Sequence, residues 1–477
     1  MIPAPRLTIS GLKGGAGKTL LALGLARALV QDGLRLKPFK KGPDYIDAAL
    51  LGLAAGRPAT NLDLFFLPPH ELRALFVHAF ALAGNGGKPA DLALIEGNRG
   101  LFDGRDLEGS CSTAALARTL QSPILLTLDC TKTTRTSAAL VQGVLAFEPD
   151  LPIAGVVLNK LGSERHGAQV RRAIEHYCPV PVLGALPRLI GDPLPERHKG
   201  LVLQQSFETH ADVETRLNTL AAAMREHLDL HRIRQLALAA PPLPEKTMAW
   251  KSASTALAGV RPRIGYVRDA AFWFYYEENL EALRRAGAEL FRLSLLDSEA
   301  WPDLDGLYLG GGFPEEFCAE LAASPKIALL QEYAEQGMPI YAEGGGALLL
   351  AASMERQGNS YPMAGVFPVS ASFHERPQGL GYVEAAVILY NPFHPQHIAL
   401  KGHEFHYTRC KLLPGAQAEY ALQLSCGTGM GQGGDGLIHK ATFASYMHIF
   451  APAAPHWAER FVAAAANLAA RDRQKHV

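Results

Sequence analysis

A glycine-rich loop near the amino terminus has the residue types and spacing that bind nucleotide phosphates. It reads Gly-Leu-Lys-Gly-Gly-Ala-Gly-Lys-Thr from Gly11 to Thr19, between an apolar run and a helical pattern. The backbone N–H groups of such a loop face phosphate oxygens, Lys18 can reach the β- and γ-phosphates, and the Thr19 hydroxyl can hold magnesium. The predicted ATP-binding residues are Lys13, Gly14, Gly15, Gly17, Lys18 and Thr19.

Carboxylates follow two further apolar runs, where a metal ion beside the phosphates would need oxygen ligands. Asp44 and Asp47 follow one run, Glu96 ends the other, and Asp103 lies just beyond it. The carboxyl ends of neighbouring parallel strands meet beside a phosphate loop, and magnesium takes oxygen ligands. One such acid alone is more often a helix cap or a turn residue, but this set, after a phosphate loop, indicates a metal and catalytic site.

The elements that must position these residues alternate between short apolar runs and amphipathic helical patterns. Such alternation predicts an α/β domain with a mostly parallel, doubly wound sheet. The expected strands are Leu7–Ser10, Leu36–Phe39, Leu92–Glu96, Ile124–Asp129, Ile153–Asn159 and Val182–Leu186. The expected helices include Thr19–Gln31 and Ala168–Tyr177.

A break in periodicity separates this series from a second one. Residues 238–262 contain the proline-rich segment Ala-Ala-Pro-Pro-Leu-Pro and a Ser- and Ala-rich stretch, which together predict an interdomain linker. Because 477 residues exceed one ordinary core, we expect one domain over residues 1–237 and another over 263–477. The second domain has expected strands at Ile264–Val267, Gly306–Leu309 and Pro339–Ala342 and an expected helix at Glu277–Ala286.

The overall composition limits the classes of partner. Hydrophobic residues make up 48% and charged residues 19% of the chain, as in globular proteins, and Lys+Arg equal Asp+Glu at 46 each. Without a net positive field, neither nucleic acid nor a membrane surface is expected as a partner. The sequence shows no signal-peptide pattern or spanning segment, and its six scattered cysteines lack metal-ligand spacing. These features predict a cytoplasmic protein without structural zinc.

Two longer motifs are specific enough to indicate a family. Residues 39–47 read Phe-Lys-Lys-Gly-Pro-Asp-Tyr-Ile-Asp, and residues 96–104 read Glu-Gly-Asn-Arg-Gly-Leu-Phe-Asp-Gly. Further motifs lie at residues 155–160, 163–166, 194–198, 268–272, 307–312 and 402–407. In this order they resemble the cobyrinate a,c-diamide synthase family over nearly the whole chain. The resemblance implies two α/β domains: an N-terminal P-loop domain with a dethiobiotin-synthetase-like parallel sheet, and a C-terminal flavodoxin-like class I glutamine amidotransferase domain.

The resemblance also implies a reaction and roles for residues. Members amidate the a- and c-side carboxylates of a cobyrinate-like tetrapyrrole with ATP, magnesium and glutamine, through an acyl phosphate that ammonia attacks. The related dethiobiotin synthetase fold implies Thr19, Asp44 and Glu96 as the magnesium shell, while Asp47 and Asp103 match acids implicated in catalysis and substrate handling. The candidates for substrate binding are Lys40, Lys41, Tyr45, Arg99, Arg165, His166, Arg197, His198 and Lys199.

The predicted amidotransferase domain lacks its nucleophile. The family places a cysteine in the motif Tyr-Ala-Glu-Cys-Gly-Gly, whereas residues 341–346 of this chain read Tyr-Ala-Glu-Gly-Gly-Gly, with Gly344 at the nucleophile position. Glycine has no atom that can attack a glutamine amide. By the same resemblance His448 matches the catalytic base, and the backbone N–H groups of Gly311, Gly312 and Gly345 are the candidate oxyanion donors.

Three interpretations of Gly344 stay open. The enzyme uses free ammonia, a separate glutaminase delivers ammonia, or the glycine was introduced to trap a complex. Cys318 is a weaker candidate for a replacement nucleophile, because it lies in an expected helix shortly after Gly312.

Two other functions compete with the preferred one. The first keeps the chemistry and changes the substrate to sirohydrochlorin or sirohaem, as in other branches of the family. The second is a nucleotide-switched ATPase of the MinD/ParA kind, because Lys13 gives the loop a resemblance to the phosphate loop of dimeric ATPases. In those ATPases this lysine reaches nucleotide across a subunit interface, so a homodimer is expected here. A solvated loop lysine is the alternative.

Overall fold

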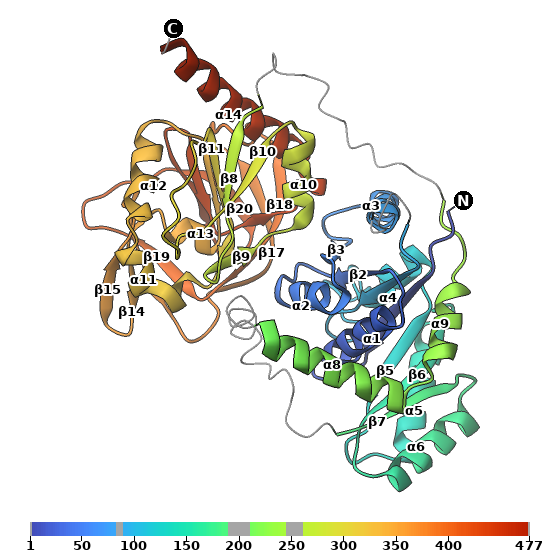
Figure 1. Ribbon diagram of the computed structural model, residues 1–477. Coiled ribbons are helices and arrows are strands. Elements are labelled where there is room, and N and C mark those ends of the chain that lie inside the picture. The colour runs from blue at the N-terminus through green and yellow to red at the C-terminus, as the bar shows by residue number, and fades with distance from the viewer. Residues whose placement is uncertain (1, 83–88, 189–209, 245–260, 476–477) are drawn as a thin grey trace. The chain divides into compact units, whose positions relative to one another are not determined.

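The computed structural model describes residues 2–82, 89–188, 210–244 and 261–475 (Figure 1). The chain forms two compact units, Met1–Ala249 and Trp250–Val477. Within the described ranges, no helix combines the length and the apolar character needed to cross a bilayer.

The first unit is built on a parallel sheet whose seven described strands have the order β3-β2-β4-β1-β5-β6-β7. Strand β4 (Leu92–Glu96) is buried along its whole length. Such continuous burial is typical of a parallel sheet that is covered on both faces. The other strands are β1 (Arg6–Gly11), β2 (Leu36–Lys41), β3 (Thr60–Leu62), β5 (Ile124–Asp129), β6 (Ile153–Leu161) and β7 (Val182–Pro187).

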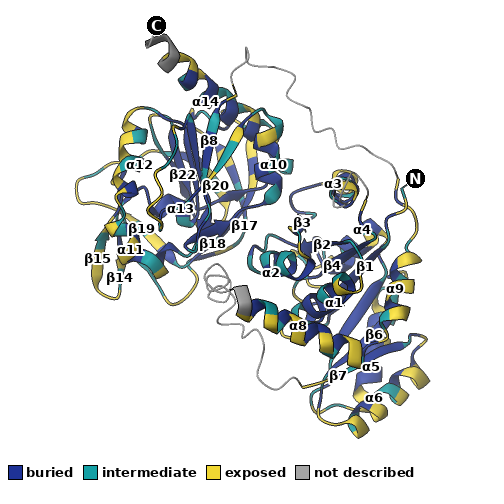
Figure 2. Cartoon of the chain, in the orientation of Figure 1, coloured by how far each residue is buried: buried dark blue, intermediate teal, exposed yellow. Residues whose placement is uncertain are grey.

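Helices cover this sheet, and their outer faces are exposed while the strands are buried (Figure 2). Local caps fix several helix starts: Ser112 accepts a hydrogen bond from the Ala115 N–H, and Ser163 accepts one from the His166 N–H. Such caps satisfy N–H groups that the first helical turn leaves open. The helices are α1 (Lys18–Gln31), α2 (Ile46–Ala55), α3 (Pro69–Leu82), α4 (Thr113–Leu120), α5 (Arg135–Phe147), α6 (Glu164–Tyr177), α8 (His210–His227) and α9 (Leu230–Leu238).

The strand order brings three strand ends together. Strands β2, β4 and β1 are parallel neighbours, so their carboxyl ends lie along one edge of the sheet. The glycine loop follows β1, Asp44 and Asp47 follow β2, and Glu96 ends β4. Ligand sites of open α/β sheets lie at the carboxyl ends of the strands, so this edge is the candidate site.

The first unit confirms the six strands expected in this half, with ends within two residues of the prediction. The sequence does not predict β3, which has three residues and no alternation of polar and apolar side chains. Helix α6 begins at Glu164, earlier than the expected start at Ala168, because Ser163 caps it.

The second unit contains a mixed sheet of ten described strands in the order β10-β8-β11-β13-β22-β21-β20-β17-β18-β23. The first five are parallel and the remaining neighbours are antiparallel. The parallel part, with its helices, confirms the predicted α/β class. Its strands are β8 (Arg263–Val267), β10 (Glu289–Leu293), β11 (Gly306–Leu309), β13 (Ile340–Glu343) and β22 (Thr442–Ser445).

Smaller sheets and helices complete the second unit. The antiparallel strands of the large sheet are β17 (Gly379–Val387), β18 (Ala399–His406), β20 (Tyr420–Cys426), β21 (Gly434–His439) and β23 (His448–Ile449). A two-stranded sheet contains β9 (Phe272–Phe274) and β12 (Gly311–Gly312). A four-stranded sheet contains β14 (Ala351–Arg356), β15 (Asn359–Pro362), β16 (Phe367–Phe373) and β19 (Thr408–Leu412). The helices are α10 (Glu277–Arg285), α11 (Cys318–Ala323), α12 (Lys326–Glu335), α13 (Gly345–Leu348) and α14 (His456–Lys475).

A buried arginine ties the segment after α9 back to the first unit. Arg6 is 0% exposed and donates hydrogen bonds to the carbonyls of Leu120 at 2.6 Å and Pro241 at 2.8 Å. Ile2 and Leu243 exchange two backbone hydrogen bonds. Burial lowers the pKa of Arg6 to about 10, so its guanidinium stays charged at neutral pH. The first residues of the expected linker therefore pack on this unit.

We expect Arg6→Met to lower the free energy of unfolding of the first unit by about 2–3 kcal/mol, because buried carbonyls lose a charged donor. The shift of the urea midpoint, followed by circular dichroism, measures the change. Arg118→Met is the control, because Arg118 is exposed and pairs with Glu148 at the surface. The control should cost less than about 0.5 kcal/mol, and equal effects of the two variants would contradict the assignment.

Candidate functional site

The glycine loop joins β1 to α1 and is braced from β6. Gly17 precedes α1 at φ +95°, a conformation that favours glycine. A Cβ at Gly17 would lie 2.0 Å from Asn159 Nδ2, so no side chain fits there. Asn159 in turn donates a hydrogen bond to the Ala16 carbonyl at 2.9 Å. The loop thus presents the start of α1, where unpaired N–H groups favour an anion.

Three lysines surround this loop in different ways. Lys18 Nζ donates to the Lys13 carbonyl at 2.9 Å, so the lysine expected to meet phosphate is folded back on its own loop. The Lys13 side chain is 68% exposed, and its Nζ lies 3.6 Å from Asp129 Oδ2. Lys160 contacts the Gly15 carbonyl at 2.7 Å and Asp129 at 3.2 Å. Sequence reasoning gave no role to Lys160 and Asp129, although residue 160 closes a family motif.

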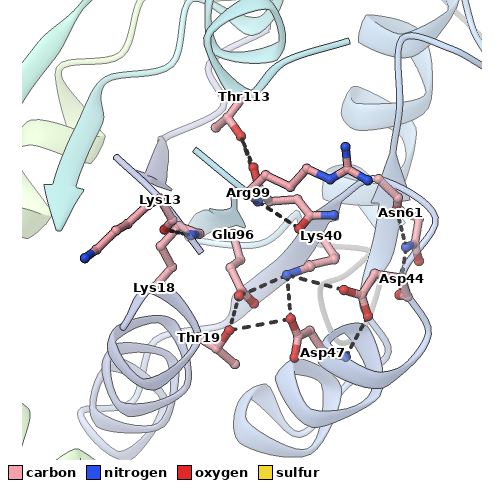
Figure 3. A network of polar contacts seen from close by, with 12 residues as sticks. Lys13, Lys18, Thr19, Lys40, Asp44, Asp47, Asn61, Glu96, Arg99 and Thr113 are labelled. Carbon is pink, nitrogen blue, oxygen red and sulfur yellow. Dashed lines mark hydrogen bonds and ion pairs between the residues drawn. The ribbon is translucent and has the colours of Figure 1, made fainter. Parts of the chain in front are cut away.

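A buried lysine lies at the centre of the acidic residues (Figure 3). Lys40 Nζ is 2.8 Å from Asp47 Oδ2, 3.0 Å from Glu96 Oε1 and 3.7 Å from Asp44 Oδ2. Thr19 Oγ1 donates to the same Glu96 oxygen at 2.6 Å. The structure therefore brings the predicted magnesium ligands and Asp47 together, with the Lys40 ammonium among them.

The charges of this cluster depend on one another. Burial opposes the ammonium form of Lys40, but Asp47, Glu96 and Asp44 together raise its pKa above the usual value. Burial raises the pKa of Glu96, against the opposing effect of Lys40. Burial and the nearby Lys40 charge lower the pKa of Lys18. A cation from outside would therefore approach carboxylates that already surround a positive charge.

The oxygen atoms around Lys40 have the chemistry that magnesium requires. Glu96 Oε2 is buried and has no hydrogen-bond partner among the described residues, so one carboxylate oxygen remains open to a cation. In those same residues, no group of three or more His, Cys, Asp or Glu side chains is arranged to hold a metal on its own. Magnesium usually combines one or two carboxylates with water and substrate phosphates. Thr19, Asp44 and Glu96 therefore fit a site that is completed by nucleotide.

Four further candidate residues lie at or after the carboxyl ends of β2 and β4: Lys41, Tyr45, Arg99 and Asp103. Asp103 Oδ2 accepts a hydrogen bond from the Gly100 N–H at 2.8 Å, and its charge partly opposes the lowering of the Lys18 pKa. Lys41 is buried, and burial lowers its pKa, with the charge of exposed Arg99 acting in the same direction. Tyr45 is also buried, immediately before α2.

Two candidates at the start of α6 lie apart from the acidic cluster. His166 Nε2 is 2.5 Å from the Thr133 carbonyl, and its Nδ1 accepts from the Gly162 N–H, so this ring fastens two loops together. Arg165 is exposed. Both follow β6, which β4, β1 and β5 separate from β2. Arg197, His198 and Lys199 lie outside the described residues.

In the second unit, Gly344 lies in the tight turn between β13 and α13. Its φ and ψ are +51° and −118°, which side chains of L-residues rarely adopt. Strained strand-to-helix turns of this kind expose the nucleophile of hydrolases. The backbone of the turn is fixed by a 2.8 Å hydrogen bond from the Gly344 N–H to the Ser445 carbonyl.

The His448 ring fills the space beside this glycine. A Cβ at Gly344 would lie 2.4 Å from His448 Nε2, so a side chain here requires the imidazole to move. His448 Nδ1 is 3.4 Å from Glu343 Oε2. Glu343 is held by the Tyr308 hydroxyl at 2.9 Å and the Ile449 N–H at 3.0 Å. Glu343 is therefore a fixed carboxylate beside the ring, a neighbour that sequence reasoning missed although the residue directly precedes Gly344.

The candidate oxyanion glycines lie around the same turn. A Cβ at Gly311 would be 2.6 Å from His448 Cε1, and a Cβ at Gly345 would be 3.1 Å from the Gly312 nitrogen. The structure thus brings these three glycines together with His448 and Gly344. Such N–H groups can stabilise a developing oxyanion, but the turn offers no side chain that could attack an amide.

Cys318 has the environment of a structural thiol. It is buried at the start of α11 and donates to the Glu315 carbonyl at 3.4 Å. Burial raises the pKa of the Cys318 thiol to about 11. Because the thiolate is the reactive form, this group is a poor nucleophile at neutral pH.

Comparisons with known proteins match both units. Residues 7–202 match the CobQ/CobB/MinD/ParA nucleotide binding domain, and residues 263–455 match the CobB/CobQ-like glutamine amidotransferase domain. The chain is 43% identical to the cobyrinate a,c-diamide synthase of Magnetococcus marinus over 95% of this chain and 96% of that protein. The chain belongs to the cobyrinate a,c-diamide synthase family. As a family member it is an ATP-dependent amidoligase.

Other proteins of the same name support this assignment. The cobyrinate a,c-diamide synthase of Syntrophotalea carbinolica is 40% identical over 96% of this chain and 98% of that protein. The protein of this name from Archaeoglobus fulgidus is 35% identical over 96% of this chain and 97% of its own length. Similarity over the full length shows that this family member has both domains of its relatives.

We expect Lys18→Ala to lower ATP turnover by ~100-fold or more, the range for loss of one preorganised charge-stabilising donor. The reason is that the phosphate loop loses the cation that reaches the β- and γ-phosphates. Phosphate release measures the change, with Arg172→Ala, an exposed arginine on α6, as control. Turnover by Lys18→Ala at the rate of the unaltered protein would refute the assignment of the loop.

Proposed function

We propose that this protein amidates the a- and c-side carboxylates of a cobyrinate-like tetrapyrrole, with ATP and magnesium, through an acyl phosphate. The observation that carries the proposal is the convergence of the phosphate loop, Lys40 and three carboxylates at one sheet edge, in a chain similar to cobyrinate a,c-diamide synthases over nearly its full length.

The chemistry follows from the poor leaving group of a carboxylate. Transfer of the γ-phosphoryl group to a substrate carboxylate oxygen replaces a hydroxide-like leaving group with phosphate. Ammonia then attacks the carbonyl carbon, and the C–O bond to phosphate breaks. Magnesium, which Thr19, Asp44 and Glu96 would hold, would supply positive charge that neutralises the phosphate groups. Lys18 and Lys40 supply positive charge beside the transferred group, and Asp47 is an anionic partner of Lys40 at 2.8 Å.

The tetrapyrrole carboxylates need local positive charge, because the chain has equal numbers of acidic and basic residues. Lys41 and Arg99 are the best-placed candidates, since their charges interact with each other and Lys41 adjoins Lys40 in β2. Arg165 is exposed at the same edge of the sheet but farther along it, and Arg197, His198 and Lys199 lie between β7 and α8 in the chain. We propose that these groups bind the peripheral carboxylates away from the reacting one.

The nitrogen source is proposed to be free ammonia. Gly344 has no side chain, and His448 Nε2 lies 2.4 Å from the position that a cysteine Cβ would take. A covalent intermediate would divide the hydrolysis of the glutamine amide into two easier steps. Without it, water must attack the amide directly, which is slower. Delivery of ammonia by a separate glutaminase is the other route compatible with this site.

A homodimer is also proposed. The support is Lys13, whose side chain is 68% exposed on the phosphate loop and only loosely paired with Asp129. In that position it is available to nucleotide bound by a second copy. The alternative is a lysine that remains solvated on the loop.

The direct test of the reaction uses purified protein with ATP, magnesium, ammonium and either cobyrinate or sirohydrochlorin. We expect two amides on cobyrinate, counted by mass spectrometry, with matching release of phosphate. Amidation of sirohydrochlorin alone would show that cobyrinate is not the substrate, and it would leave the proposed reaction type unchanged. ATP turnover without amidation of either tetrapyrrole would refute the proposal.

The nitrogen source generates a separate prediction. The unaltered protein should use ammonium and give little or no product with glutamine. Gly344→Cys should raise the ratio of the glutamine-supported to the ammonium-supported rate, provided that His448 turns away from the new Cβ. Gly344→Ala is the matched control, because it introduces the same crowding and backbone strain without sulfur. Efficient use of glutamine by the unaltered protein, or an equal ratio in both variants, would contradict the proposed role of this position.

A further inference from the structure

The ammonium group of Lys40 occupies the centre of the oxygen atoms that a metal ion would use (Figure 3). It is 2.8 Å from Asp47 and 3.0 Å from Glu96, while its side chain is only 2% exposed. Thr19 donates to the same Glu96 oxygen that Lys40 contacts. One lysine thus compensates carboxylates from β4 and from the segment after β2.

The same oxygens cannot serve the ammonium and a metal together. Magnesium binds oxygen at about 2.0–2.1 Å in near-ideal octahedral geometry. A metal on Glu96 Oε1 would therefore lie a few ångströms from Lys40 Nζ, which is 3.0 Å from that oxygen. Like charges at such a separation repel strongly away from bulk water.

We propose that Lys40 is an internal cation that holds the metal position of the nucleotide-free protein and leaves it when magnesium enters with nucleotide. This inference rests on the proposed function, because it takes the acidic cluster as the magnesium site. The exchange keeps a positive charge beside the three carboxylates at every stage. Without a neighbouring cation, the charged carboxylates would lower the stability of the fold, since Glu96 is fully buried.

Two details of the site show how the exchange would begin and where the Lys40 ammonium would go. Glu96 Oε2 is buried without a hydrogen-bond partner among the described residues, so an entering cation finds one open oxygen on the carboxylate that Lys40 contacts. Lys40 has a long, flexible side chain, and phosphate oxygens of an arriving nucleotide offer its ammonium a new anionic partner. Magnesium alone offers no such partner, so it should bind weakly to the nucleotide-free protein.

The test measures metal affinity without nucleotide, substrate or turnover. Free Mn²⁺, as a probe for the magnesium site, is titrated into the full-length protein and detected by electron paramagnetic resonance. Lys40→Met should bind Mn²⁺ at least ~10-fold more tightly than the unaltered protein, because the competing cation is gone.

Lys18→Met is the matched control, because it removes one positive charge from the same pocket. Its Nζ contacts the Lys13 carbonyl, not the carboxylates, so simple charge repulsion should raise Mn²⁺ affinity by only ~2–3-fold. A larger gain for Lys40→Met than for Lys18→Met supports occupancy of the metal position. A gain no larger than that of the control would overturn the proposal.

If Lys40→Met does not fold, Lys40→Gln takes its place in the titration. Lys40→Gln retains a hydrogen-bond donor for Asp47 and should also bind Mn²⁺ more tightly than Lys18→Met does, with the opposite ranking again overturning the proposal. The titration requires no amidation, so its failure leaves the proposed reaction intact. Conversely, absence of amidation in the unaltered protein would refute the reaction while the ranking of metal affinities could still be read.

Discussion

The buried carboxylate of Glu96 is the group on which the first site depends. It is 0% exposed at the end of β4, and burial opposes its charged form. Lys40 from the neighbouring strand supplies the countercharge, and Thr19 from α1 donates a hydrogen bond of 2.6 Å. Three elements that meet at one sheet edge are thereby linked. In the proposed function, phosphate, a metal ion and a substrate carboxylate come together at this linked edge.

The second unit retains the frame of a glutaminase site without its reactive atom. Glu343 Oε2 lies 3.4 Å from His448 Nδ1, and the turn at Gly344 has a backbone conformation that L side chains rarely adopt. The absence of one side chain lets the ring close against the turn. Activation of the carboxylate needs nothing from this site, because the phosphate loop and the acids belong to the first unit. The proposed reaction therefore takes its ammonia from another source.

Much of the fold was predictable from the sequence, because parallel strands give continuous apolar runs and the phosphate loop marks where a strand meets a helix. The strand order then explains why acids after two different strands meet. Side-chain direction was harder to predict. Lys40 and Lys41 are adjacent in β2, and alternation sends them to opposite faces, so only one reaches the acids. His166 matched a family motif, yet its ring contacts the Thr133 carbonyl through a long-range pairing that no local pattern encodes.

In the proposed reaction, a substrate carboxylate is activated by phosphoryl transfer at the edge formed by β1, β2 and β4. The most direct measurement follows oxygen from a tetrapyrrole labelled with oxygen-18 in its carboxylates, during amidation with ATP, magnesium and ammonium. An acyl phosphate predicts that each amide formed sends one labelled oxygen into inorganic phosphate, because the C–O bond breaks when ammonia attacks. Amide formation with all of the lost label in water, and none in phosphate, would contradict the account.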